Sequence, residues 1–290
     1  MISDFTIIQK EYEYEEGKNY NESYFETIIN TSQKVYLKNK NHLLFSFHKN
    51  AIDNEKYFPI IDKNYTSRIL TSCNRKTATG NNCDQSRTPT GILGYIDCLT
   101  PQHKTLLFGI NNGARKTKFL IEKKKMWKET LPLYEKVDEI FKSATPRQYK
   151  QQKKEYDQIH NQLKILKTNF TTITVNRNFR TATHTDKGDL KNGLSCLICI
   201  GNNKYNGGFL GFPKQKVLVK MRPGDVIFMD SHQPHCNTKL NTGKSGVRFS
   251  LVCYVREKMK DFTHPVVVEN QTFFLTEKDF QRFSESKKLI

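Results

Sequence analysis

Two or three histidines and one aspartate in the second half of the chain have the types and spacing of a metal site. His184 and Asp186 are separated by one residue in strand-like sequence, so on an extended strand both side chains point the same way. A third ligand must come from another segment, because one strand cannot surround a face of a metal. His232 and His235 both follow the strand-like run 224–230. The spacing alone leaves open which of the two supplies the third ligand.

Two histidines and one carboxylate leave one face of an octahedron open, as in non-haem Fe(II) oxygenases. Arg248 and Ser250 follow on a later strand-like segment and are again two residues apart. A guanidinium beside a hydroxyl suits a carboxylate, because the planar fork donates two charge-assisted hydrogen bonds. The pair therefore predicts a binding site for the far carboxylate of a 2-oxo acid that chelates iron. A structural ion pair is the alternative role for Arg248.

The elements that must position these residues change character near Asn169. Before it, the apolar spacing predicts helices over 131–142 and 147–166, after a strand over 105–110. After it, short strand-like runs alternate with tight turns, which is typical of an antiparallel sandwich or barrel of jelly-roll type. The fold expected is therefore α+β, with a double-stranded β-helix core and flanking helices. The predicted core strands are 170–176, 194–200, 208–212, 217–221, 226–229 and 248–255.

A chain of 290 residues without an internal repeat or a long linker predicts a single domain over 1–290. Within it, we interpret residues 1–110 as an N-terminal elaboration with short strands, and residues 170–258 as the catalytic jelly-roll core. The polar segment 72–90 predicts a loop. The tail predicts a short strand over 272–275, followed by a polar helix.

The net charge of +18 predicts attraction to a polyanion, most simply a nucleic acid. A lysine- and asparagine-rich composition can also reflect an AT-rich genome, so the charge does not settle the partner. Seven cysteines, an odd number without regular spacing, argue against a disulfide framework. The sequence has neither a secretory signal nor an apolar run of about 18 residues. We expect a monomeric intracellular protein that does not enter a membrane, located in the nucleus if the source is eukaryotic.

Residues 176–189 resemble the TET/JBP family of 2-oxoglutarate- and Fe(II)-dependent dioxygenases, in particular its thymine-hydroxylating J-binding-protein branch. Three further segments match that pattern: Gly-Gly-Phe-Leu-Gly-Phe-Pro at 207–213, the run 223–238, and Arg-Phe-Ser-Leu-Val-Cys-Tyr at 248–254. The resemblance is firm over 170–258 and fainter back to 112. The chain has no room for the separate helical domain with which J-binding proteins recognise the glucosylated base, so we do not expect that recognition here.

The resemblance implies a complete set of site residues. The family's distal iron ligand directly precedes a small residue and a polar-Thr pair, which here is His235 before 236–238. His184, Asp186 and His235 would then hold Fe(II). Arg248, with Ser250 beside it, would bind 2-oxoglutarate, and O2 would be the second co-substrate. Arg115, Asn178 and Arg180 are candidates for contacts with the co-substrate or the substrate.

The substrate implied by the resemblance is DNA, in which the 5-methyl group of thymine would be hydroxylated to 5-hydroxymethyluracil. An enclosed iron site cannot reach that methyl group in a duplex, so the base has to flip out. Oxidation of 5-methylcytosine in DNA is one alternative. A protein hydroxylase of prolyl type uses the same iron chemistry and is a second. A catalytically dead basic DNA-binding module is a third, although an intact ligand set speaks against it.

Overall fold

Four strands at the centre of the large sheet are buried along almost their whole length. The computed structural model describes residues 4–38, 41–65 and 90–288, so the predicted loop over 72–90 lies outside the described residues except for its last one. Among the described residues, eleven strands form the large sheet, and only the pairing of β1 with β3 is parallel. Its order is β1 (Phe5–Ile8), β3 (Gln33–Leu37), β4 (His42–His48), β12 (Val226–Met229), β8 (Ser195–Gly201), β15 (Arg248–Tyr254), β7 (Thr172–Arg177), β5 (Thr90–Ile96), β6 (Ala114–Lys116), β17 (Gln271–Leu275) and β16 (His264–Val268).

A smaller sheet packs against one face of the large sheet and makes the sandwich. Strict alternation along β8 produces two cores: Cys196 and Ile198 face the helices, whereas Leu197 and Cys199 face the inter-sheet side. Side chains of β10 and β11 pack with those of β4 and β12 in this inter-sheet core. The predicted jelly-roll core is therefore confirmed. The smaller sheet has the order β13 (Cys236–Asn237), β10 (Leu210–Phe212), β11 (Val217–Val219) and β2 (Thr27–Ile29), and β9 (Asn206–Gly207) pairs with β14 (Leu240–Asn241).

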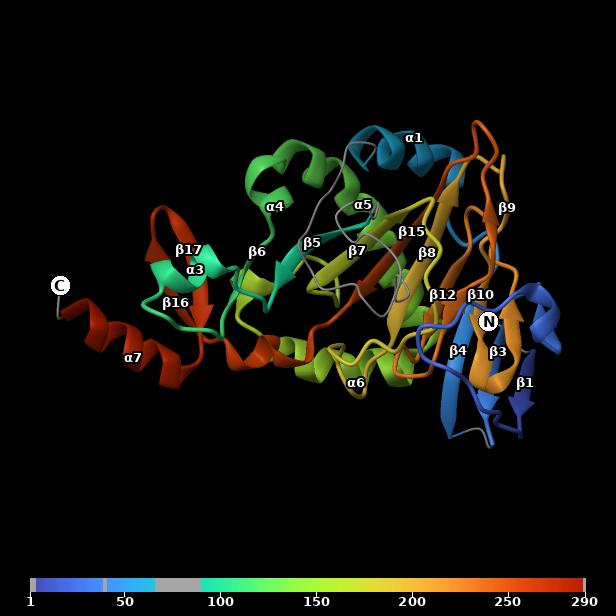
Figure 1. The fold of residues 1–290 in the computed structure, drawn as a ribbon, viewed down its shortest axis with the longest axis horizontal. Helices are drawn as coiled ribbons and strands as arrows, with labels where there is room; N and C mark the ends of the chain where they lie inside the picture. Colours follow the sequence, from blue (N-terminus) through green and yellow to red (C-terminus); the bar gives the residue numbers. More distant parts are fainter. Residues whose placement is uncertain (1–3, 39–40, 66–89, 289–290) are drawn as a thin grey trace.

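Helices cover the opposite face of the large sheet, with α5 crossing the central strands (Figure 1). Phe141 of α5 is fully buried and stacks on both Phe170 and Phe228, with ring centroids 6.0 and 5.0 Å apart. Because the helices close this face, the cavity of the fold lies on the other face, between the sheets. The helices on this side are α1 (Asn54–Tyr65), α4 (Lys118–Glu122), α5 (Lys124–Ala144) and α6 (Pro146–Asp157).

The predicted strand over 105–110 is wrong, because its first two residues are the end of a helix, α3 (Pro101–Leu106), and a turn follows over 107–109. A capping box explains the start: the hydroxyl of Thr100 accepts from the amide of His103, and Nδ1 of His103 accepts from the amide of Thr100. Pro101 then occupies the first helical turn, where its missing N–H costs nothing. The apolar residues that suggested a strand pack after the helix, where Leu107 and Ile110 are buried.

The two predicted central helices exist with different bounds. Residues 131–142 lie inside the longer α5, and the predicted helix over 147–166 ends early, at Asp157. Beyond that point Ile159, Leu163 and Ile165 are buried without helical structure, apart from a short 3-10 turn, η3 (Asn161–Leu163). Periodic burial therefore continued past the true end of the helix. Further 3-10 turns are η1 (Glu22–Tyr24), η4 (Pro213–Gln215) and η5 (Glu257–Asp261).

The C-terminal elements lie together at one end of the molecule, where β17 and β16 are the last two strands of the large sheet (Figure 1). The predicted strand and helix of the tail are present as β17 and α7 (Glu277–Lys288), and β16 precedes them. Phe273, Leu275 and Phe283 are buried there together with Leu107 of the α3 segment. Among the described helices, none combines the length and apolar character needed to cross a lipid bilayer.

Candidate active site

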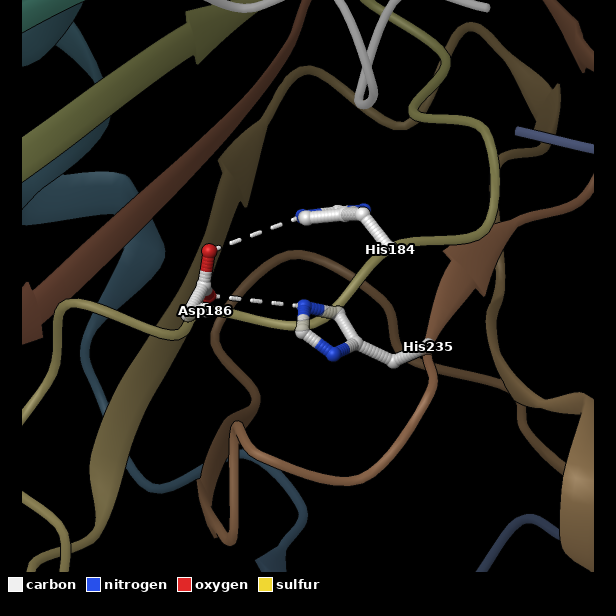
Figure 2. Close-up of side chains that lie close together, drawn as sticks. All are labelled: His184, Asp186 and His235. Atoms are coloured by element: carbon white, nitrogen blue, oxygen red, sulfur yellow. Dashed lines mark ion pairs between the residues drawn. The ribbon is translucent and has the colours of Figure 1, made fainter. Parts of the chain in front are cut away.

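Three side chains converge at the edge of the inter-sheet cavity (Figure 2). Nε2 of His184 lies 3.8 Å from one carboxylate oxygen of Asp186, and Nε2 of His235 lies 3.6 Å from the other. The candidate ligand atoms of all three residues lie within 4.8 Å of one another. Both imidazoles are buried, whereas the Asp186 side chain is 30% exposed. Two imidazole nitrogens and one carboxylate therefore surround one point at the cavity wall.

Backbone carbonyls fix the orientation of both imidazole rings. Nδ1 of His184 lies 2.8 Å from the carbonyl oxygen of Ala182, and Nδ1 of His235 lies 2.9 Å from that of Gln233. A carbonyl oxygen can only accept, so each Nδ1 carries the proton and donates it. Each Nε2 consequently keeps its lone pair on the side that faces Asp186, and a neutral imidazole in this tautomer is a metal ligand.

The expectation that His184 and Asp186 share one strand is wrong. They lie in the connection between β7 and β8, where hydrogen bonds from another segment of the chain hold the main chain in place. His184 and His235 form an isolated antiparallel bridge, exchanging two N–H···O bonds of 3.0 Å. The amide of Asp186 donates to the carbonyl oxygen of Ser231 at 3.0 Å. The segment after β12 therefore supplies one histidine and also positions the other two side chains.

The structure separates the two histidines that follow β12. His235 points toward Asp186, whereas His232 pairs with Asp230 at 3.3 Å, and the other oxygen of Asp230 binds His42 at 2.8 Å. Burial would raise the pKa of the Asp230 carboxyl, but hydrogen bonds from His232 and His42 hold it below its ordinary value. His232 is thus engaged in an ion-pair cluster apart from the candidate metal site.

The cavity beside the triad has a volume of about 360 Å³. Its walls come from the inner faces of both sheets and from the loop that follows His184. This size falls in the range of small-molecule sites in proteins, which are mostly apolar with a few convergent polar groups. The apolar part of the wall consists of Ile92, Ile96, Leu197, Leu210, Met229 and Val252.

Arg248 is buried at the end of the same strand face that lines the cavity. It is 1% exposed, and none of its three guanidinium nitrogens has a hydrogen-bond partner among the described residues. Ser250, two residues further along β15, lines the cavity, whereas Arg248 lies beyond it against Gly208. A buried charge without a partner costs several kcal/mol. An anion is therefore the missing partner that this site would hold.

The three other candidate contact residues bond to the protein's own backbone and do not line the cavity. Nε of Arg115 donates to the carbonyl oxygen of Cys98 at 2.8 Å. Asn178, in the left-handed region at φ +49°, accepts from the amide of Arg248 at 2.7 Å. Arg180 donates to the carbonyl oxygens of Asn237 and Tyr20. Their contact with a co-substrate or a base stays a prediction.

Four residues that the sequence did not single out line the cavity: Asn176, Asp189, Tyr254 and Arg256. Continued alternation from Arg248 along β15 points to Tyr254, and the same period along β7 points to Asn176. No comparable sequence pattern points to Asp189. It accepts hydroxyl hydrogen bonds from Ser195 and Ser231, and burial together with the nearby Asp186 charge raises the pKa of the Asp189 carboxyl to about 8.

Replacing Gly188 with alanine is expected to destabilise the loop that carries Asp186. A Cβ at this position would lie 2.5 Å from Nη1 of Arg256, whose guanidinium is held at 2.8 Å by Asp97. The clash should lower the free energy of unfolding in urea by about 1–2 kcal/mol. In an Arg256→Ala background the same substitution should cost much less, because the colliding atoms are gone. An equal cost in both backgrounds would contradict the proposed clash.

Comparison with known proteins identifies the family to which the chain belongs. Residues 102–257 match the Tet_JBP family, the oxygenase domain of the 2OGFeDO superfamily. Thymine dioxygenase JBP1 of Crithidia fasciculata is 39% identical over 150 residues, which are 52% of this chain and 17% of that protein. The bifunctional helicase and thymine dioxygenase JBP2 of Leishmania tarentolae is 36% identical over 170 residues, 58% of this chain and 14% of that protein. The chain thus aligns with less than a fifth of either relative.

A solved structure extends the likeness of the fold beyond the matched family region. NgTET1 in complex with 5mC DNA superposes with a TM-score of 0.59 at 16% identity, covering 89% of this chain and 84% of that one. A jelly roll with this cluster in its cavity defines the class, and the chain is a 2-oxoglutarate- and Fe(II)-dependent dioxygenase. It belongs to the Tet_JBP family, whose match covers more than half of its length. Enzymes of this superfamily use Fe(II), with 2-oxoglutarate and O2 as co-substrates.

Proposed function

We propose that the chain hydroxylates the 5-methyl group of thymine in DNA and produces 5-hydroxymethyluracil. The observation that carries this proposal is the His184, Asp186 and His235 cluster opening into a cavity, within the segment that aligns with proteins named thymine dioxygenases. An enclosed site of this kind requires a flipped base, at a cost of a few kcal/mol.

The residues present fit both groups that the superfamily requires. We propose that Fe(II) binds the Nε2 atoms of His184 and His235 and the carboxylate of Asp186. Hydrogen bonds already hold both imidazoles in the tautomer that leaves Nε2 unprotonated. The guanidinium of Arg248, which has no partner among the described side chains and main-chain groups, suits the distal carboxylate of 2-oxoglutarate, with Ser250 beside it. When bound, the iron and the two co-substrates supply the oxidation of a methyl C–H bond, and 2-oxoglutarate becomes succinate and CO2.

The chain itself contributes binding, orientation and exclusion of water. Apolar side chains such as Ile92 and Val252 wall the cavity, so a methyl group can enter without losing favourable contacts. The ring of Tyr254 lines the same space, with its hydroxyl hydrogen-bonded to Thr174 at 3.2 Å, and so offers a fixed aromatic surface for a planar base. Arg256 and Asp189 add polar groups that can bind the edge of a base.

We propose a single domain in which the N-terminal segment is part of the oxygenase fold. β1, β3 and β4 belong to the large sheet, and β2 pairs with β11 of the small sheet. Interleaving of this kind ties the N-terminal segment to both sheets of the sandwich. The expected monomeric state and the intracellular, nuclear location stay predictions.

The substrate is tested by incubating the protein with Fe(II), 2-oxoglutarate and a duplex that contains both thymine and 5-methylcytosine. Nucleosides are then quantified by mass spectrometry. The proposal expects 5-hydroxymethyluracil that disappears with the Asp186→Ala variant. Formation of 5-hydroxymethylcytosine alone would replace thymine with 5-methylcytosine as the substrate. Succinate production that does not increase when DNA is added, but does increase with a protein substrate, would overturn the DNA assignment.

Lys187 is expected to contact the DNA backbone, because it is exposed and lines the cavity directly after Asp186. Lys187→Glu should weaken duplex binding and lower the slope of log affinity against log salt by about 1. Lys278→Glu in α7 makes the same change of charge at the far end of the molecule (Figure 1) and should have little effect. Equal losses in the two variants would indicate a response to net charge alone.

A further inference from the structure

Asn176 lies beside Ser250 on the cavity face of the large sheet. It belongs to β7 and pairs directly with Ser250 of β15, so the two side chains are neighbours. Nδ2 of Asn176 donates to the hydroxyl oxygen of Ser250 at 3.4 Å. Both residues are buried and both line the cavity. Arg248 lies on the same face of β15, two residues before Ser250.

The carbonyl oxygen of the Asn176 side chain has no hydrogen-bond partner within the described part of the chain. Oδ1 is buried and accepts no hydrogen bond from the described residues. Leaving a buried polar group unpaired costs about 1–3 kcal/mol, so such groups are rare without a reason. The guanidinium of Arg248, on the adjacent strand, likewise has no hydrogen-bond partner among the residues that the structure describes. Asn176 lines the cavity and Arg248 lies just beyond it on the same face of the sheet, and neither group has a partner among the described residues. Together they indicate a polar ligand that contacts both.

We propose that Asn176 is a further binding residue for the distal carboxylate of 2-oxoglutarate, acting next to Arg248 and Ser250. The inference rests on the co-substrate site proposed above. A carboxylate only accepts hydrogen bonds, so Asn176 contributes an N–H. Rotating its amide by half a turn puts Oδ1 where it accepts from the Ser250 hydroxyl, and puts Nδ2 where the unpaired oxygen lies. The amide oxygen and nitrogen are nearly equal in size, so the rotation requires no repacking.

Direct binding measurements test this role without turnover. Calorimetric titration of 2-oxoglutarate into protein loaded with Mn(II), without DNA or O2, gives the affinity of the co-substrate alone. Asn176→Ala should weaken binding about tenfold, the size expected for a lost hydrogen bond to a charged group. Asn176→Asp should weaken it further, because a second carboxylate repels the first. Neither substitution should change the affinity for 2-oxobutanoate, which has no distal carboxylate.

Asn169 provides a matched control for the loss of a buried asparagine. It is also fully buried, and its Oδ1 has no partner in the described ranges, yet it precedes β7 and is not among the residues that line the cavity. Asn169→Ala should lower the Tm and leave the affinity for 2-oxoglutarate unchanged. The inference would be overturned if Asn176→Ala bound 2-oxoglutarate as tightly as the wild-type protein does. Equal losses of affinity for 2-oxoglutarate and for 2-oxobutanoate would also overturn it.

The same titrations separate this inference from the proposed substrate. Absence of 2-oxoglutarate binding to the wild-type protein would overturn both the co-substrate site and the role of Asn176. A wild-type protein that binds 2-oxoglutarate with the expected dependence on Asn176, but does not oxidise thymine, would support the inference and reject only the substrate.

Discussion

Replacement of His235 with alanine is expected to abolish 2-oxoglutarate turnover, whereas replacement of His232 with alanine leaves it largely intact. Nε2 of His235 faces Asp186, and its ring is fixed through Nδ1, so the substitution removes one of three converging donors. Changing a group that only supports a ligand typically costs about 10–100-fold in metal affinity or activity. Loss of the ligand itself should exceed that range. Succinate formation and bound iron, measured on both variants, check the prediction.

His232 is a close control because it has the same chemistry three residues earlier. Its ring pairs with Asp230, so the loss of this side chain should lower local stability more than it lowers iron binding. Asp186→Ala and His184→Ala should behave like His235→Ala. Iron retained in His235→Ala and lost in His232→Ala would reverse the assignment of the third ligand.

Arg248→Met is expected to stabilise the ligand-free protein and to abolish the further stabilisation of the protein by 2-oxoglutarate. The guanidinium is 1% exposed and unpaired among the described residues, so an apolar side chain of similar length removes an uncompensated charge. The free energy of unfolding in urea should rise by about 1–4 kcal/mol. Affinity for 2-oxoglutarate should fall by about 2–5 kcal/mol, because the carboxylate loses its buried partner.

Thermal unfolding separates these two effects in one experiment. The Tm of the wild-type protein with Mn(II) should rise with the concentration of 2-oxoglutarate, whereas that of Arg248→Met should be higher at the start and remain constant. Metal binding should survive, because Arg248 is not part of the triad. Arg248→Lys should retain part of the response, since lysine keeps the charge but lacks the planar fork. A lower starting Tm for Arg248→Met would contradict the unpaired charge, and an unchanged response to 2-oxoglutarate would remove Arg248 from the site.

The sequence by itself determined where the central strands lie and which residues share a face of each strand. Alternation with period 2 located β7, β8, β12 and β15 to within about two residues, because inward and outward side chains of a sandwiched strand face different surroundings. The same alternation grouped Arg248 with Ser250. Local patterns predicted these strands because the residues that face each side of a strand all lie within that strand.

Only the tertiary structure decided how the three candidate ligands meet. His184 and Asp186 are not on a strand, so their common direction comes from the bridge to His235 and from the bond to Ser231. Choosing His235 over His232 on geometric grounds likewise needed the turn after β12 to be placed. These contacts join segments about 45–50 residues apart, and the free energy that fixes a loop in this way lies in long-range hydrogen bonds and packing that no local pattern records.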